Sequence, residues 1–354
     1  MKLLAVASLL TLSFAIHHSP LFPIGQGNTD FPYRLLGNGK WEMGNVAASA
    51  SPLIFWQQGI ETAAALKQAG IERIAVAPDK ADQWRKAGFE VVPMTEDELK
   101  TREKLVVPGA SGRPDLAAAT GRPWLDANGW RFTRNPTGQF FYELPKGRAV
   151  LAVAESFAYN ADTIFKIDPA DLAEVGRVTA FLKTIPVDDR LPLVADIGVV
   201  DDGSKMLGEV MNLLSRRNLL FKPIKTPSPQ LRLNIQFGTK TYPRSAGADP
   251  SEFAQTIRRR LTDDARTLRV YGSEVVIARL TGDSKHLRLH LLNYGRRDFE
   301  GMRIRLRGML GKGDTYILGQ GKTALLDYET LGQFTEFSLP RMSLYAVVDL
   351  PRTN

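Results

Sequence analysis

The chain has 354 residues, of which 44% are hydrophobic and 24% are charged, as in folded rather than disordered proteins. Its net charge of +8 comes from scattered Lys and Arg, which argues against a nucleic-acid partner and leaves an attraction to acidic glycans open. The absence of cysteine excludes disulfides, thiolate metal sites and cysteine nucleophiles.

The N-terminus is similar to a secretory signal peptide. Lys2 precedes the apolar run LLAVASLLTLSFAI, and Ser13 and Ala15 are small residues at the spacing of a cleavage site. The run is too short to span a bilayer comfortably. We therefore predict a signal peptide over residues 1–15, a periplasmic or extracellular bacterial protein, and no stable membrane span after cleavage. An uncleaved membrane anchor is the alternative.

An alternation of strands and helices follows a lead-in rich in Gly, Pro and Asn. Apolar runs predict strands at 51–57, 71–78 and 89–94, separated by helices at 61–70 and 81–88 that end at Gly70 and Gly88. Helices closed by Gly and followed by β-branched runs are typical of βαβ units with parallel strands. The next predicted strands are WRFTR (130–134), QFFYEL (139–144) and TIFKI (163–167), with a helix at 147–162.

Two polar runs mark predicted helix starts. Asp168 precedes Pro169, and this pair is typical of a helix cap followed by the first helical residue. Asp201 and Asp202 end a strand in VVDDGS, at the edge where open α/β sheets bind ligands. VVDDGS is similar to the donor-sugar signature of inverting glycosyltransferases. The alternative, which the lack of a later Asp-x-Asp favours, is that Asp202 or Ser204 caps the next helix.

The remaining sequence changes period. The helix 204–218 and the strand LLFKPI complete a βαβ unit with the strand before VVDDGS. From residue 267, short strands alternate with Gly and Asp turns, which predicts an antiparallel β-sandwich. In MRIRLR, Met302, Ile304 and Leu306 are predicted to point inward, and the arginines between them outward.

Carboxylates without a local structural role are candidates for glycoside hydrolysis, which needs two carboxyl groups facing one bond. Asp126 in WLDANGWRF and Glu143 in QFFYE are the predicted catalytic pair. Aromatic faces and amides suit sugar rings, and the predicted substrate-binding residues are Trp124, Asn128, Trp130 and Asp168. The structural alternatives are core packing for the two tryptophans and a helix cap for Asp168.

Other chemistries have weaker support. His286 and His290 are a conceivable metal pair on a strand but lack a third ligand, and we predict no metal and no other cofactor. Glu155 is interpreted as a solvated or packing residue in the middle of a helix. No Gly-x-Ser-x-Gly or Walker motif occurs.

Three runs resemble the large bacterial glycoside hydrolases of the β-galactosidase type: AESFAYNADTIFKID, VADIGVVDDGSKMLGEVMNLLSRRNLLFKPI and LRLHLLNYG, with His290 to Tyr294 in the last. The resemblance implies a reduced or degenerate TIM-barrel-like α/β domain over residues 16–190. It further implies a flavodoxin-like α/β domain over 191–265 and a C-terminal β-sandwich over 266–354. The family's Asn-Glu acid/base dipeptide does not occur in this sequence.

We therefore predict an exported carbohydrate-active protein of glycoside-hydrolase type, with catalysis either retained on Asp126 and Glu143 or degenerate. Its expected partner is a carbohydrate or polysaccharide, and a homo-oligomer stays open. The alternatives are a non-catalytic glycan-binding or assembly module and a glycosyltransferase that uses the strand end at Asp201 and Asp202.

Overall fold

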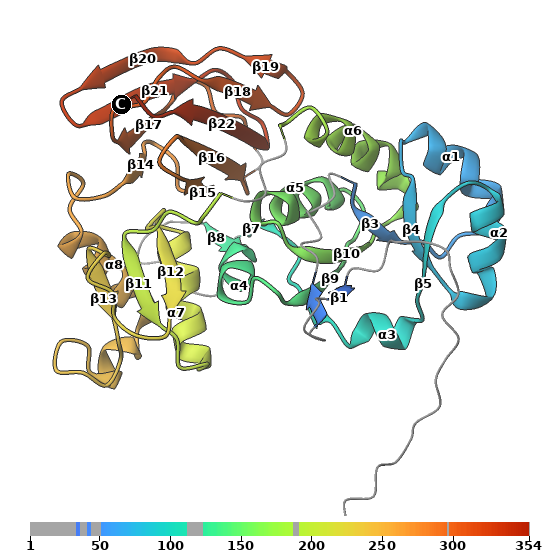
Figure 1. Ribbon diagram of the computed structural model, residues 1–354, viewed down its shortest axis with the longest axis horizontal. Coiled ribbons are helices and arrows are strands. Elements are labelled where there is room, and N and C mark those ends of the chain that lie inside the picture. The colour runs from blue at the N-terminus through green and yellow to red at the C-terminus, as the bar shows by residue number, and fades with distance from the viewer. Residues whose placement is uncertain are drawn as a thin grey trace, which may run out of the picture. The chain divides into compact units, whose positions relative to one another are not determined.

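The computed structural model describes residues 33–35, 41–43, 51–111, 123–186, 191–295 and 297–353 (Figure 1). The chain forms two compact units, residues 1–46 and 47–354. In the first unit, β1 (Tyr33–Leu35) and β2 (Trp41–Met43) pair antiparallel. The predicted signal peptide, residues 1–15, lies outside the described residues. No helix among the described residues is long and apolar enough to cross a membrane.

A six-stranded parallel sheet with the order β5-β4-β3-β10-β9-β6 lies at the start of the second unit. Its strands are β3 (Leu53–Phe55), β4 (Arg73–Val76), β5 (Glu90–Pro93), β6 (Glu103–Lys104), β9 (Gln139–Glu143) and β10 (Asp162–Lys166). If the two edges of this sheet were joined, the strands would follow one another in chain order, from β3 through β4, β5, β6 and β9 to β10. The last of these strands, β10, pairs with the first, β3. The sheet is open between β5 and β6, which no pairing of the described residues joins.

Six helices accompany this sheet: α1 (Ala63–Gln68), α2 (Ala81–Lys86), α3 (Glu96–Lys100), α4 (Gly129–Arg134), α5 (Ala149–Tyr159) and α6 (Leu172–Leu182). The predicted Gly stops of the first two are confirmed, because Gly70 and Gly88 have φ values of +67° and +89°. The predicted Asp168 cap is also confirmed, since its side chain accepts a hydrogen bond from the backbone N–H of Ala170 at 2.9 Å.

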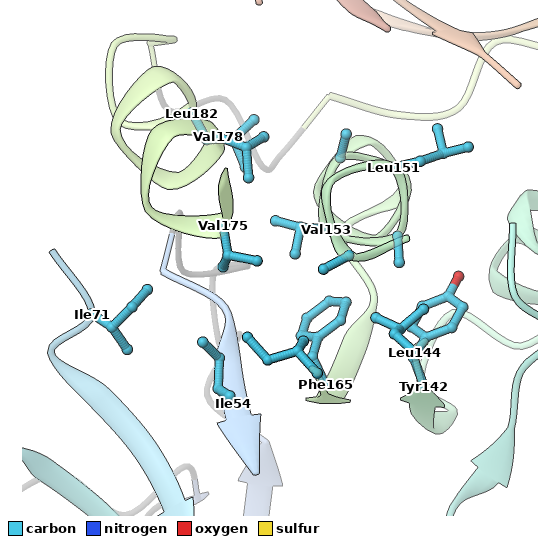
Figure 2. Packing of buried hydrophobic residues seen from close by; sticks show 14 of the residues in the cluster. Ile54, Ile71, Tyr142, Leu144, Leu151, Val153, Phe165, Val175, Val178 and Leu182 are labelled. Atoms are coloured by element: carbon cyan, nitrogen blue, oxygen red, sulfur yellow. The ribbon is translucent and has the colours of Figure 1, made fainter. Parts of the chain in front are cut away.

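The central strands of the sheet are buried on both faces, since successive side chains of a strand point to opposite sides and both sets are buried in β3 and β10. Ile54 and Phe165 belong to the large core, which also contains buried residues of α1, α2, α4, α5 and α6; Figure 2 shows α5 and α6 packed beside these two side chains. Phe55 and Ile164 belong to a small core with Leu99 of α3. The near-continuous apolar runs of the strands follow from this double burial.

The predicted strand at residues 130–134 is wrong, because these residues form α4. Phe132 is buried in the large core, whereas Trp130 packs against the middle core formed around Val199, Val210 and Phe253. Residues two apart on a helix lie about 200° apart around its axis. A helix between two cores therefore shows the apolar–polar alternation of a strand. The chain before α4 forms an antiparallel pair, β7 (Gly109–Ser111) with β8 (Trp124–Asp126).

A second, three-stranded parallel sheet has the order β12-β11-β13. It consists of β11 (Ile197–Val200), β12 (Phe221–Ile224) and β13 (Leu233–Ile235), with helices α7 (Lys205–Ser215) and α8 (Pro250–Arg260). The predicted βαβ unit is confirmed, because β11 and β12 are parallel and α7 joins them. Ser204 caps α7 by accepting a hydrogen bond from the backbone N–H of Leu207 at 3.2 Å.

The C-terminal residues form two antiparallel sheets, with the orders β14-β17-β21-β20 and β15-β16-β22-β18-β19. Their strands are β14 (Leu268–Val270), β15 (Val276–Gly282), β16 (His286–Asn293), β17 (Met302–Arg307), β18 (Asp314–Ile317), β19 (Gly321–Thr323), β20 (Leu326–Leu331), β21 (Phe334–Leu339) and β22 (Tyr345–Pro351). The predicted alternation in β17 is confirmed, since Met302, Ile304 and Leu306 are buried. Ile304 and Val348 bring both sheets into one core.

Candidate functional site

Polar side chains gather where the strands of the six-stranded sheet end. Glu143 ends β9, and its carboxylate contacts Lys104 Nζ at 2.5 Å and Lys166 Nζ at 3.5 Å. Lys166 also lies 3.8 Å from Glu96 of α3, to which Gln57 donates a hydrogen bond. The carboxyl ends of parallel strands lie at one edge of a sheet, where α/β enzymes carry their sites. We name these five residues the strand-end cluster.

The charge state of Glu143 is set by its lysines. Hydrogen bonding and charge attraction from Lys104 lower the pKa of Glu143, with a smaller effect from Lys166. The carboxylate is therefore ionised at neutral pH and is unsuited to the proton-donating role that glycoside hydrolysis requires. It retains the ability to accept hydrogen bonds from hydroxyl groups.

Asp126, the other predicted catalytic carboxylate, has partners of its own. It ends β8, where it accepts hydrogen bonds from Trp124 Nε1 at 3.0 Å and from Ser111 Oγ at 3.4 Å. Among the described residues, no hydrogen bond or ion pair joins it to Glu143. The two carboxylates thus belong to different local clusters.

Asn128, predicted to bind substrate, is fully buried. Its side-chain amide donates to Tyr142 Oη and Val106 O, both at 3.0 Å, and to Glu155 Oε2 at 3.2 Å. Its backbone N–H donates to Glu155 Oε1 at 2.6 Å. The side chain is therefore part of the protein interior and does not face a ligand surface.

Glu155 is the centre of this interior network. The hydroxyls of Tyr142 and Tyr294 each donate to its carboxylate at 2.6 Å. Burial raises the pKa of Glu155, although these hydrogen bonds act in the opposite direction. The solvated interpretation of Glu155 is wrong, because it is 0% exposed. The signal in the sequence is a lone carboxylate in the apolar run AVLAVAESFAY, since a helix apolar on all sides is buried.

Asp201 of VVDDGS is held by α4. Arg134 Nε and Nη2 donate to its two carboxylate oxygens at 2.8 and 2.7 Å, and this partner lowers the pKa of Asp201. Asp202 accepts a hydrogen bond from the backbone N–H of Ser204 at 3.0 Å and lies 3.8 Å from Arg244. The paired aspartates therefore fix the start of α7 and its contact with α4.

Trp130 and His290 are also engaged within the protein. The guanidinium of Arg131 lies 4.4 Å from the centre of the Trp130 ring. His290 is buried, and its Nδ1 lies 2.7 Å from Tyr345 Oη. No group of three or more His, Asp or Glu side chains able to hold a metal ion occurs within the described part of the chain.

A cleft of about 1070 Å³ opens beside Trp124, slightly larger than the roughly 300–1,000 Å³ usual for ligand pockets. Its walls are residues 123–124, the end of α7 with 213–218, one face of α8, and segment 266–274 around β14. Trp124 is the predicted substrate-binding residue that lines it. The others, Asn128, Trp130 and Asp168, are not among its described wall residues.

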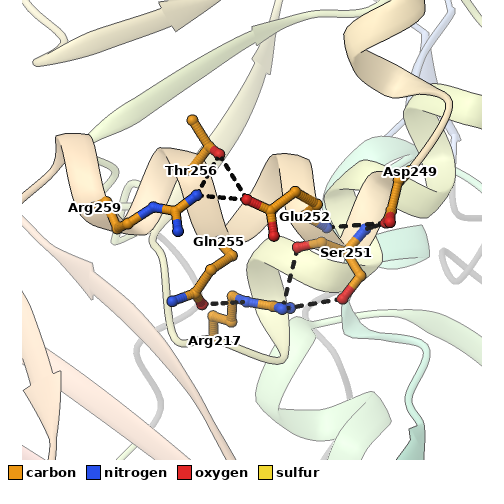
Figure 3. Close-up of polar contacts among 7 residues, drawn as sticks. All are labelled: Arg217, Asp249, Ser251, Glu252, Gln255, Thr256 and Arg259. Carbon is orange, nitrogen blue, oxygen red and sulfur yellow. Dashed lines mark hydrogen bonds and ion pairs between the residues drawn. The ribbon is translucent and has the colours of Figure 1, made fainter. Parts of the chain in front are cut away.

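The α8 wall of the cleft is fixed by polar contacts (Figure 3). Asp249 caps α8 by accepting from the backbone N–H groups of Ser251 and Glu252, both at 2.9 Å. Arg217, from the end of α7, donates to Ser251 O and Oγ, both at 3.2 Å, and to Gln255 Oε1 at 3.5 Å. Helices α7 and α8 are thus joined along the cleft by one guanidinium.

No family model matches the chain, and no curated protein matches it. Among solved structures, it is similar to α-L-fucosidase isoenzyme 2 from Paenibacillus thiaminolyticus, with 10% identity and a TM-score of 0.46 over 78% of this chain and 71% of that one. A GH42 β-galactosidase from G. stearothermophilus matches with 10% identity and a TM-score of 0.35, over 85% of this chain and 63% of that one. The β-galactosidase from Bacillus circulans sp. alkalophilus has 9% identity and a TM-score of 0.36, with 79% and 63% covered.

The weak, partial resemblance to bacterial glycoside hydrolases that the sequence predicts is therefore confirmed. The chain spans less than two thirds of the length of either β-galactosidase. Identities and TM-scores of this size are too low to transfer an activity or a site residue to this chain.

Proposed function

We propose that this chain is an exported carbohydrate-active protein of glycoside-hydrolase type that binds glycans and has lost hydrolysis. The observation that carries the proposal is the strand order of the six-stranded sheet, in which β10 pairs with β3 as the last and first strands of a βα barrel do. Residues 16–190 are then a reduced barrel opened between β5 and β6. Residues 191–265 are a flavodoxin-like unit, and residues 266–354 are a sandwich.

The placement of the helices supports this proposal. Helices α1, α2, α4, α5 and α6 contribute buried residues to the large core on one face of the sheet, and α3 to the small core on the other. In a βα barrel the helices cover the outer face of the strands. In a doubly wound sheet they would be divided between the two faces, whereas here five of these six helices contribute to one face and α3 to the other.

The state of the carboxyl groups supports the proposed loss of hydrolysis. An acid in glycoside hydrolysis must hold a proton near neutral pH, which needs a raised pKa. The pKa of Glu143 is lowered, and the pKa of Glu155 is raised in a position with no exposed surface. The strand-end cluster offers charged and amide groups that can form hydrogen bonds with sugar hydroxyls.

Binding and turnover measured on the same protein test this function. The purified chain is titrated calorimetrically with neutral and acidic oligosaccharides, and released reducing sugar is measured under the same conditions. We expect binding without release. Release that disappears in both Glu143→Gln and Asp126→Asn would establish a hydrolase instead, and a chain that binds no glycan would refute the proposal. N-terminal sequencing of protein recovered outside the cytoplasm tests export and cleavage after residue 15.

The glycosyltransferase alternative makes a different prediction about Asp201, which ends β11. It requires a nucleotide donor to bind the wild-type chain and to lose affinity in Asp201→Asn. Since Arg134 already occupies both oxygens of Asp201, we expect no donor binding in either protein.

A further inference from the structure

The cleft beside Trp124 is lined by an excess of arginine. Its wall contains five arginines, Arg216, Arg217, Arg258, Arg266 and Arg269, and two carboxylates, Glu252 and Glu274. Glu252 also forms an ion pair at 2.5 Å with Arg259, which does not belong to the wall. The lining therefore favours a ligand with negative charge.

Several of these guanidinium groups are held in place by the protein. The guanidinium of Arg216 lies over Trp124 at 3.9 Å from the ring centre, and that of Arg269 lies over Tyr271 at 4.1 Å. A guanidinium stacked on a ring keeps its N–H groups in its own plane, directed outward at its edges. Arg217 is fixed through Ser251 and its neighbours on α8 (Figure 3). Ordering before binding lowers the entropy that a ligand must overcome.

The positive charges are crowded as well as ordered. Burial, followed by the charges of Arg258 and Arg269, lowers the pKa of Arg266 to about 10. A single carboxylate, Asp263, forms ion pairs with two arginines, Arg266 and, at 2.5 Å, Arg269. Within the described part of the chain, the side chain of Arg258 takes part in no hydrogen bond or ion pair. An anion in the cleft would relieve this repulsion.

We infer that this cleft binds an acidic oligosaccharide, a short chain of pyranose rings that carry carboxylate groups. The choice of a sugar rests on the proposed carbohydrate function. A planar guanidinium and a carboxylate form two parallel hydrogen bonds, which sets both affinity and orientation. Glu252, Glu274 and the Gln255 amide provide acceptors for the sugar hydroxyls between those carboxylates.

A nucleic acid fits this lining less well. Its phosphates recur along the whole strand, and binding relies on many cationic contacts over an extended surface. In the cleft, some of these phosphates would face Glu252 and Glu274. An acidic sugar alternates charge with hydroxyls and so matches a mixed lining of arginines and carboxylates.

The full chain is titrated calorimetrically with oligogalacturonates, with neutral galacto-oligosaccharides of equal length, and with a thymidine oligonucleotide. Arg258→Gln and Arg269→Gln change the cleft, and Arg177→Gln on the exposed side of α6 is the matched control. We expect oligogalacturonate to bind wild type and Arg177→Gln equally, and each cleft variant to bind about tenfold more weakly or worse. The affinity of wild type should fall as salt is added. Equal thermal unfolding of all four proteins shows that the variants are folded.

Each other outcome overturns the inference in a distinguishable way. Neutral oligosaccharides that bind wild type and both cleft variants equally, with no preference for acidic ones, would leave the proposed function and remove the acidic ligand. Oligogalacturonate binding lost in Glu143→Gln but kept in the arginine variants would place it at the strand-end cluster. An oligonucleotide that binds more tightly and depends on Arg258 would make the cleft a nucleic-acid site. Binding of no glycan would remove the proposed function as well.

Discussion

Glu155 shows how a single side chain can join distant segments. Its carboxylate accepts four hydrogen bonds, two from Asn128 and one each from Tyr142 and Tyr294. An ionised carboxylate has about four acceptor positions, so these donors satisfy it fully. The donors come from β9, from the turn before α4 and from the end of β16. One buried carboxylate therefore links the six-stranded sheet to the C-terminal strands.

Replacing this carboxylate should weaken the fold. Glu155→Gln leaves an amide NH₂ where an acceptor stood, so at least one buried donor loses its partner. We expect the free energy of unfolding to fall by about 1–3 kcal/mol, as measured by urea denaturation. Glu174→Gln, at a half-exposed position of α6, serves as control and should change it by less than about 0.5 kcal/mol. Equal effects at both positions would contradict the role of Glu155.

The raised pKa of Glu155 gives this residue a pH signature. The folded chain keeps its proton over a range in which the unfolded chain, with an ordinary value of 4.5, has released it. The contribution of Glu155 to stability is therefore greatest below that value and declines as the pH rises through the folded pKa. We expect the stability of wild type relative to Glu155→Gln to decrease as the pH rises above the ordinary value of 4.5. A constant difference would contradict the raised pKa.

Residues were predictable where their role is local. The Asp168 and Ser204 caps depend on neighbours within three positions, so the sequence reveals them. The arginine cleft could not be predicted from the spacing of residues in the sequence, because its side chains come from three separate segments: the end of α7, α8 and the residues around β14. Asn128 likewise suggested a sugar contact, and its burial follows from partners up to 27 positions away.

At the scale of elements, α6 approaches α1 through a glycine. A Cβ atom at Gly176 would lie 2.4 Å from Ala69 O and 2.9 Å from Ala69 Cα, both of them backbone atoms. The backbone at the end of α1 cannot move aside as a side chain can. Close packing of these two helices therefore requires glycine at this position.

We expect Gly176→Ala to destabilise the protein by about 1–3 kcal/mol, although alanine normally favours a helix. Gly247→Ala is the control, because the atoms nearest to its Cβ would belong to the flexible side chain of Met206, which can shift. Chemical denaturation of both variants should show the larger loss at Gly176. A similar or reversed order would contradict the backbone clash.

The pair between Arg134 and Asp201 joins α4 to the start of α7. Both side chains are mostly buried, with 18% and 23% exposed, so the pair is partly shielded from water. In a double-mutant cycle of Arg134→Gln and Asp201→Asn, we expect a coupling energy of about 1–2 kcal/mol from thermal or urea unfolding. Asp202→Asn keeps a side-chain oxygen for the Ser204 N–H and weakens only the 3.8 Å contact with the exposed Arg244, so it should cost less than about 0.5 kcal/mol. Coupling near zero would show that the pair is not stabilising.

Helices and strands that bury one face were predicted correctly from the sequence, whereas α4, which packs against two cores, was not. Helices α1 and α2 end at glycines, and β17 alternates along its length, so local pattern and structure agree. Helix α4 carries Trp130 and Phe132 toward different cores, and this arrangement imitates a strand. The difference is a property of the tertiary structure, which a five-residue pattern does not contain.

At the scale of the whole second unit, the C-terminal strands complete the core of the N-terminal sheet. Ile277, Leu292 and Val347, from β15, β16 and β22, are buried in the same large core as α5 and α6. The six-stranded sheet and its helices therefore do not form a complete core by themselves. Its stability depends on residues more than 100 positions later in the chain.

Removing residues 266–354 should therefore prevent the remainder from folding. We expect a chain that ends at residue 265 to lose its cooperative urea transition and to bind a dye for exposed apolar surface. The intact chain is the reference. A truncated chain with a sharp transition would show that the N-terminal sheet can close its core alone.

Because no pairing of described residues joins β5 and β6, the six-stranded sheet has two free edges, which bears on self-association of the protein. An open sheet has two edges whose backbone N–H and C=O groups invite strand addition by another chain, the first step of many aggregates. Here β5 ends at Pro93, which has no N–H, and β6 consists of two charged residues, Glu103 and Lys104. Both edges are thus poor templates for strand addition, and self-association, where it occurs, should use side-chain surfaces instead of a shared sheet.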